Sequence, residues 1–183
     1  MQGHHLILGE LVDFITGETL ADTHDERYRQ KLARMLVNQK GLKKKEIKPR
    51  RVLRISAGEK RAIIKVDFEI HVSGKIGMII KYGPGSLVTR QRPALAVSRL
   101  VAPYQIPIVV VTNGEDADIL EGKTGEVIVK GLQSIPSKGD VIEKLTATNL
   151  RRISAEQAEI ESRIVYTYEV DGSCPCDDTI CRL

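Results

Sequence analysis

The sequence contains no tryptophan and only two phenylalanines among its 183 residues. A surface that stacks the bases of single-stranded nucleic acid needs several aromatic rings, so the chain is poorly supplied for that kind of binding. It also lacks any apolar run near the roughly 20 residues that a membrane-spanning helix requires. Residues 1–10 lack the positive region and the long apolar region of a signal peptide. We therefore expect a cytoplasmic protein that has no membrane partner.

Cysteine is scarce too, and the three cysteines lie close together at Cys174, Cys176 and Cys181. In a cytosolic chain, cysteines grouped in this way indicate a metal site more than a disulfide framework. A tetrahedral Zn²⁺ site needs four ligands, so a fourth would come from elsewhere, and the adjacent His4 and His5 are the most suggestive candidates. The alternative is a tail of reduced thiols.

What the chain does contain is typical of one soluble domain that has an apolar core. Hydrophobic residues make up 42% of it and charged residues 28%, with a formal net charge of +4. Eight basic residues fall within fifteen positions, interrupted by one acid, Glu46: Lys40, Lys43, Lys44, Lys45, Lys48, Arg50, Arg51 and Arg54. Such a group suits a polyanion such as DNA, although a solvated loop between a helix and a strand would look the same.

The patterning predicts a helix first and then a sheet. Thr23 and Glu26 form a capping-box pattern that opens a helix running to about Gly41. Strand patterns follow at residues 51–55, 62–72 and 76–82, then a helix at 87–101 and a continuously apolar strand at 106–112. We expect further short strands at 117–120 and 127–129, a loop at 131–140, a helix opening at Ser154 and an edge strand at 164–170. This order predicts an α/β core with a mixed sheet flanked by helices.

Two neighbouring strands carry the charged residues that bear most directly on chemistry. Because side chains alternate along a strand, Asp67 and Glu69 share one face, and Lys81 of the next strand can lie on the same polar face. Carboxylates that hold a divalent ion, together with a lysine that stabilises phosphate charge, are the parts of a metal-dependent phosphodiesterase site. The alternative is the solvent-facing side of a hairpin.

Other polar groups can be assigned to the same site. Glu26 would lie near it, although as the last member of the capping box its side chain can instead bond back to the backbone of Thr23. In the second helix, Arg90 and Arg92 are candidates for contacts to DNA phosphates, since guanidinium groups bind phosphate oxygens in pairs. They can equally be ordinary surface residues.

Four segments, taken in order, resemble a known nuclease family: Asp25 to Leu32, Val66 to Phe68, Ile80 to Arg92 and Ile108 to Gly114. Together they resemble the N-terminal domain of the R subunit of type I restriction enzymes, over about residues 22–136. That family belongs to the PD-(D/E)XK nuclease superfamily. The resemblance implies a restriction-endonuclease-like fold of helix, three antiparallel strands, helix and strand. It also implies a site in which a helix glutamate, two strand acids and a lysine bind Mg²⁺ and cut DNA.

By position, the resemblance assigns Glu26, Asp67 and Lys81 to this site. The second strand acid falls on Ile79, which cannot bind a metal. Glu69 is the available substitute, although two residues along a strand correspond to about 6 to 7 Å. If the site is active, Asp67 holds Mg²⁺ with Glu26 or Glu69, and Lys81 stabilises the reacting phosphate. Contacts to DNA are then expected from Arg90, Arg92, Lys43, Lys44 and Lys45.

The resemblance suggests four parts: an N-terminal extension at 1–21, a nuclease domain at 22–136, a helix and strand packed on the core at 137–170, and a cysteine tail at 171–183. The leading hypothesis is a Mg²⁺-dependent DNA endonuclease that acts alone, as a homodimer or with a separate restriction subunit. The first alternative is a nuclease fold that has lost cleavage and binds DNA or a protein. The second is a small metal-binding or redox protein that uses the cysteines, and some nucleases of this superfamily hold an iron–sulfur cluster on C-terminal cysteines.

Overall fold

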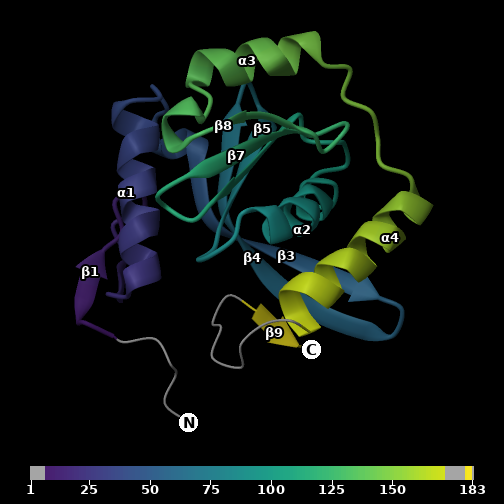
Figure 1. Cartoon of the computed structure of the whole chain (residues 1–183), viewed down its shortest axis with the longest axis horizontal. Helices are drawn as coiled ribbons and strands as arrows, with labels where there is room; N and C mark the ends of the chain where they lie inside the picture. Colours follow the sequence, from purple (N-terminus) through teal and green to yellow (C-terminus); the bar gives the residue numbers. More distant parts are fainter. Residues whose placement is uncertain (1–6, 172–179, 183) are drawn as a thin grey trace.

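A mixed β-sheet with helices on both faces organises the chain (Figure 1). The structure is a computed structural model that describes residues 7–171 and 180–182. The sheet order is β3 (Ile47–Ala57), β4 (Lys60–Val72), β5 (Lys75–Tyr82), β6 (Ile108–Thr112), β7 (Ala117–Glu121) and β8 (Val127–Lys130). Among the described strands, only β5 and β6 pair in parallel, and β9 (Ile180–Arg182) pairs with the start of β4. The predicted α/β fold with a mixed sheet is therefore confirmed.

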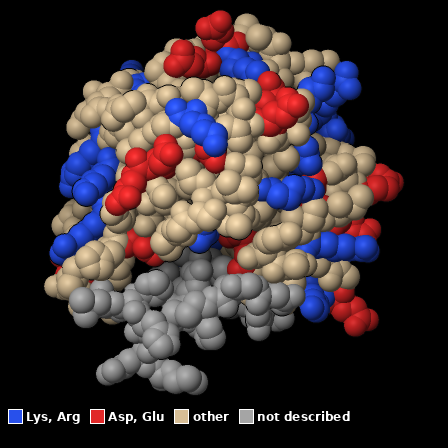
Figure 2. All heavy atoms as spheres, viewed as in Figure 1, with Lys and Arg blue, Asp and Glu red and all other residues tan. Residues whose placement is uncertain are grey.

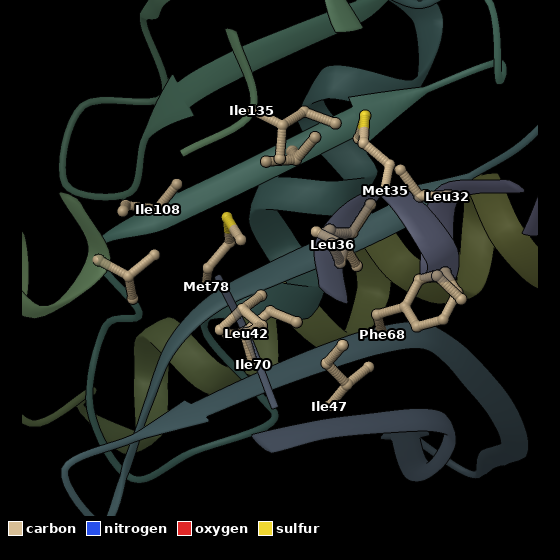
Figure 3. Packing of buried hydrophobic residues seen from close by; sticks show 14 of the residues in the cluster. Leu32, Met35, Leu36, Leu42, Ile47, Phe68, Ile70, Met78, Ile108 and Ile135 are labelled. Carbon is tan, nitrogen blue, oxygen red and sulfur yellow. The ribbon is translucent and has the colours of Figure 1, made fainter. Parts of the chain in front are cut away.

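Each face of the sheet buries its own apolar cluster. On one face, α1 (His24–Asn38) and α3 (Lys138–Ala147) cover the cluster drawn in Figure 3, which includes Leu36, Phe68 and Met78. On the other, α2 (Val88–Ser98) and α4 (Ala155–Val165) cover a second cluster around Ile79 and Val109. A separate hairpin of β1 (Glu10–Val12) and β2 (Thr19–Ala21) precedes α1. The fold thus has a helix–sheet–helix arrangement.

Strand β4 contributes to both clusters, and the change occurs at Asp67. Its even-numbered residues up to Val66 belong to the cluster under α2 and α4, whereas those from Phe68 onward belong to the cluster under α1 and α3. On the neighbouring strand, Arg50 has a φ of 50°, an uncommon left-handed value for a residue other than glycine. The expected burial of one set of alternating residues is confirmed, but the members of this set belong to two different clusters. Asp67 lies at the crossing point.

Most of the predicted elements form where expected, because their signals are local. The hydroxyl of Thr23 accepts a hydrogen bond from the backbone N–H of Glu26, so this threonine caps α1. The predicted strands at 62–72 and 76–82 correspond to β4 and β5, and the predicted strand at 106–112 contains β6. Strand β3 begins earlier than expected, at Ile47, so part of the predicted basic loop is strand.

Two predictions in the C-terminal part were wrong. The loop expected at 131–140 contains the short 3₁₀ turn Leu132–Ser134 and then the start of α3, which Ser137 and Asp140 cap reciprocally. The edge strand expected at 164–170 is instead the end of α4 followed by a π-helical segment, η3 (Tyr166–Asp171). Its alternating appearance arose from side chains buried at helical spacing, such as Val165 and Val170.

Within the described residues, none of the helices is both long enough and apolar enough to cross a membrane.

Candidate functional site

Asp67 has both carboxylate oxygens engaged by groups of the protein. Oδ1 accepts a hydrogen bond from Nε of Arg29 at 2.7 Å, and Oδ2 accepts one from the backbone N–H of Tyr82 at 2.9 Å. Arg29 comes from α1, and its side chain is 16% exposed. Burial acts to lower the pKa of the Arg29 guanidinium, but Asp67 outweighs it and the pKa lies above its usual value. Asp67 is therefore the partner of a permanently charged group.

Lys81 follows directly after the last paired residues of β4 and β5, Phe68 and Ile80, and is also engaged by groups of the protein. Its Nζ is 3.1 Å from a carboxylate oxygen of Glu169 in η3, and it donates to the backbone carbonyl of Lys65 at 3.2 Å. Burial acts to lower the pKa of the ammonium, but the carboxylates of Glu169 and Asp67 outweigh it, so this pKa is raised. Sequence reasoning missed Glu169, because the segment that carries it was taken for a strand and no local pattern links it to Lys81.

Glu26 is buried on α1 and does not complete the expected capping box. One of its oxygens accepts a hydrogen bond from Gln30 at 2.8 Å, and the other is 3.7 Å from NH1 of Arg29. Arg50 lies 3.8 Å from Glu26 and forms a closer pair, at 2.7 Å, with Asp13. Burial acts to raise the pKa of Asp13, but hydrogen bonds from the backbone of Thr16 and from the side chains of Arg50 and Gln30 hold it below its usual range. Glu26 and Asp67 are thus brought together, with Arg29 between them.

Glu69 and Ile79 have different surroundings. The carboxylate of Glu69 is 2.9 Å from Nε2 of His71 and 3.6 Å from Nε of Arg51. Ile79 is fully buried in the cluster under α2 and α4. Glu69 therefore has partners other than those of Asp67, and an aliphatic side chain occupies the position where the family resemblance expects a second acid.

These residues do not fit a divalent cation as they stand. Mg²⁺ takes six oxygen ligands in near-ideal octahedral geometry, usually with one or two carboxylates and several waters. Here both oxygens of Asp67 have protein donors, and Arg29 already lies between Asp67 and Glu26. Among the residues that the structure describes, no three His, Cys, Asp or Glu side chains form a group that could hold a metal ion. The Mg²⁺ site stays a prediction, to be tested by experiment.

Comparison with known protein families matches residues 24–136 to the family described as Type I restriction enzyme R protein N terminus (HSDR_N). The match runs from the start of α1 to the residue before the cap of α3, which is more than half of the chain. The chain belongs to this family. No curated protein and no solved structure matches it. The resemblance inferred from the order of the segments is thereby confirmed.

Acids from outside the R-protein N-terminal region contact its charged residues. Asp13 precedes the matched region and pairs with Arg50, whereas Glu169 follows it and pairs with Lys81. A third, Glu161 of α4, pairs with Arg92 and Arg99 of α2. The parts that flank the R-protein N-terminal region are therefore joined to it by buried or partly buried charge pairs.

The residues predicted to contact DNA are placed differently from one another. Arg92 binds Glu161 at 2.7 Å, and Arg90 donates to the carbonyl of Pro84 at 2.9 Å, so both have partners within the protein. Lys43, Lys44 and Lys45 are exposed around a short 3₁₀ helix (Lys44–Glu46) that precedes β3, and Nζ of Lys44 lies 4.0 Å from the centre of the Phe14 ring. The three lysines are thus exposed, whereas Arg90 and Arg92 are half-buried and have partners within the protein.

The predicted metal site on the cysteines lies largely outside the described residues. Cys174 and Cys176 fall outside them, as do His4 and His5. Cys181 lies in β9, which pairs with β4 through its backbone. The Zn²⁺ and iron–sulfur hypotheses stay predictions.

Proposed function

We propose that this chain is a DNA-binding module of a type I restriction system, built on a nuclease fold that does not carry out cleavage. The observation that carries the proposal is the pairing of Asp67 with Arg29, because it engages the carboxylate on which metal-dependent cleavage would depend. Membership in the R-protein N-terminal family supports a role in restriction. Ile79, buried among apolar side chains, supports the loss of the second acid.

An exposed basic surface supports binding to DNA. We define the β3 basic surface as the exposed cations on and just before the edge strand β3: Lys43, Lys45, Lys48, Arg51 and Arg54. Two acids lie next to this surface: Glu69 is 3.6 Å from Nε of Arg51, and Glu46 accepts a hydrogen bond from the backbone N–H of Lys43 at 2.8 Å. Figure 2 shows basic and acidic side chains interspersed over the face in view, so the net charge alone does not make the whole surface basic. A local group of cations is what a polyanion needs, since each neutralised phosphate releases counterions.

The second candidate is a Mg²⁺-dependent endonuclease, which one observation favours. The fold brings Glu26, Asp67 and Lys81 together in the order that the family resemblance implies, with Asp67 and Lys81 each next to the paired residues Phe68 and Ile80 of adjacent strands. For cleavage, a metal would have to displace Arg29 from Asp67. Substituting Asp67 or Lys81 separates the two candidates, because cleavage would depend on both residues.

The first experiment measures binding and cleavage on the same DNA. We expect duplex DNA to bind with an affinity that falls steeply with salt, and to stay intact in Mg²⁺ or Mn²⁺. Replacing four members of the surface by glutamine should weaken binding and reduce the slope of log affinity against log salt by up to about 3.6, since each phosphate contact contributes about 0.9. The four are Lys45, Lys48, Arg51 and Arg54.

The matched control removes four exposed cations that lie elsewhere, Lys75, Lys123, Arg151 and Arg152, and so makes the same change in net charge. It should change the salt slope far less. Equal weakening by both sets would show that binding is a general effect of charge and not of the β3 basic surface. Cleavage by the wild type that Asp67→Ala and Lys81→Ala both abolish would instead establish the endonuclease, and the absence of DNA binding would reject both candidates.

A further inference from the structure

Arg29 occupies the space between the two acids of α1 and β4 to which the family resemblance assigns a metal. Its Nε is 2.7 Å from Oδ1 of Asp67, and its NH1 is 3.7 Å from Oε2 of Glu26. The guanidinium also lies over the ring of Tyr82, whose centre is 4.9 Å from Cζ of Arg29. Two carboxylates and an aromatic ring therefore surround this cation, which is the environment that a buried guanidinium needs.

We propose that Arg29 is a built-in cation that replaces a divalent metal between Glu26 and Asp67, so that the former metal site has become part of the framework of the fold. The physical reason is that the two carboxylates and the arginine stabilise each other. Two carboxylates close together in a partly buried place need a positive charge, and an arginine supplies one that does not dissociate or titrate under ordinary conditions. The proposal does not depend on DNA binding.

Arg29 lies within a longer row of charged side chains of the protein. Acids and bases alternate along one network, which runs from the π-helical segment η3 to the loop after β1: Glu169, Lys81, Asp67, Arg29, Glu26, Arg50 and Asp13. Every acid in it has at least one cationic neighbour within the network. The hydroxyl of Tyr82 also donates a hydrogen bond to Asp25 of α1, at 3.1 Å. Each of the four acids in the network thus has a cation of the protein beside it.

The first test measures divalent-ion binding without DNA, by following the thermal unfolding midpoint across a Mn²⁺ titration. We expect no saturable shift in the wild type. Arg29→Ala should have a lower midpoint in the absence of metal, because it leaves Glu26 and Asp67 uncompensated, and should gain a saturable upward shift in Mn²⁺. The matched control is Arg27→Ala, since Arg27 is 51% exposed and pairs only with Asp22 among the described residues. It should show no response to Mn²⁺.

Two outcomes of this titration would overturn the proposal. The first is saturable Mn²⁺ binding by the wild type that Asp67→Asn removes, because a metal would then displace Arg29. The second is an Arg29→Ala protein that is folded and still fails to gain Mn²⁺ binding, because Glu26 and Asp67 would then not form a cation site at all.

A second measurement keeps the test decisive even if Arg29→Ala does not fold. Asp67→Asn, in buffer without metal, should lower the unfolding midpoint, because it leaves a buried guanidinium short of its main partner. A metal site that lacks its ion would give the opposite sign, since removing one of two like charges relieves their repulsion. The double variant Arg29→Met, Asp67→Asn should recover part of the loss. A raised midpoint in Asp67→Asn would overturn the proposal whatever the DNA-binding assay shows.

Discussion

Replacing Glu161 by alanine should lower the free energy of unfolding by about 3 kcal/mol, at the lower end of what breaking a buried ion pair costs. Glu161 is fully buried on α4, and its two oxygens are 2.7 Å and 2.6 Å from the guanidinium groups of Arg92 and Arg99 on α2. The variant would leave both arginines without this acid. We place the loss at the lower end because Arg92 is 42% exposed and can be solvated. Urea unfolding measures the change.

The control is Glu159→Ala, two residues away on the same helix. Glu159 is 56% exposed and pairs with the exposed Arg163, so its loss should cost less than about 0.5 kcal/mol. Equal losses in the two variants would mean that the pairing of the buried Glu161 with Arg92 and Arg99 does not hold α4 in place.

The pH dependence of this variant follows from the pKa of Glu161. Burial acts to raise it, but hydrogen bonds from Arg92 and Arg99 outweigh burial and hold the pKa below its usual value. An acid whose pKa is lower in the folded state stabilises the protein above its unfolded pKa, which is about 4.3 for glutamate. The stability difference between wild type and Glu161→Ala should therefore be full at neutral pH and shrink as the pH falls from about 4.3 through the folded pKa.

Helix α4 also matters for the candidate site, because η3 continues from it directly. The segment that Glu161 anchors to α2 is the one that places Glu169 beside Lys81. Both acids follow the matched R-protein N-terminal region. The surroundings of Lys81 thus depend on a part of the chain that the family match does not cover.

The sequence predicted best those features that depend on local spacing. Thr23 as a helix cap and the alternation along β4 can be read from a few neighbouring residues, and both were confirmed. The positions of Glu26 and Arg29 on one side of α1 also follow from their spacing of three residues. Their pairing with Asp67 did not follow, because it depends on how α1 packs across the sheet.

Long-range partners could not be predicted from the sequence. Glu169 lies 88 residues after Lys81, and no pattern in the sequence around either residue predicts that the two pair. The exchange of clusters at Asp67 was not predicted either, because it depends on which helices pack over each part of β4 and not on local spacing. The start of α3 was missed for a different reason. Its capping box pairs Ser137 with Asp140, where a glutamate or glutamine is usual.

Restoring the missing acid by Ile79→Glu should not create a nuclease, and should lower the free energy of unfolding by at least about 4 kcal/mol. Ile79 is fully buried on β5, between Glu69 of β4 and Val109 of β6, and packs in the apolar cluster under α2 and α4. A carboxylate placed there would lose its hydration, and such groups show pKa values raised by 3 to 5 units, each worth about 1.4 kcal/mol. Lys81, two residues away, already pairs with Glu169.

Urea unfolding of three variants at Ile79 separates the cost of burying a charge from the cost of changing the size and polarity of the side chain. Ile79→Val should cost about 1 kcal/mol for the methylene group that it removes. Ile79→Gln adds a polar group without charge, and its cost should not vary with pH. The cost of Ile79→Glu should rise with pH, because an acid whose pKa is higher in the folded state loses stability above its unfolded pKa. A stable Ile79→Glu protein that cleaves DNA in Mg²⁺ would contradict this prediction. It would mean that cleavage requires no change other than the second acid, and that a metal displaces Arg29 from Asp67 once that acid is present.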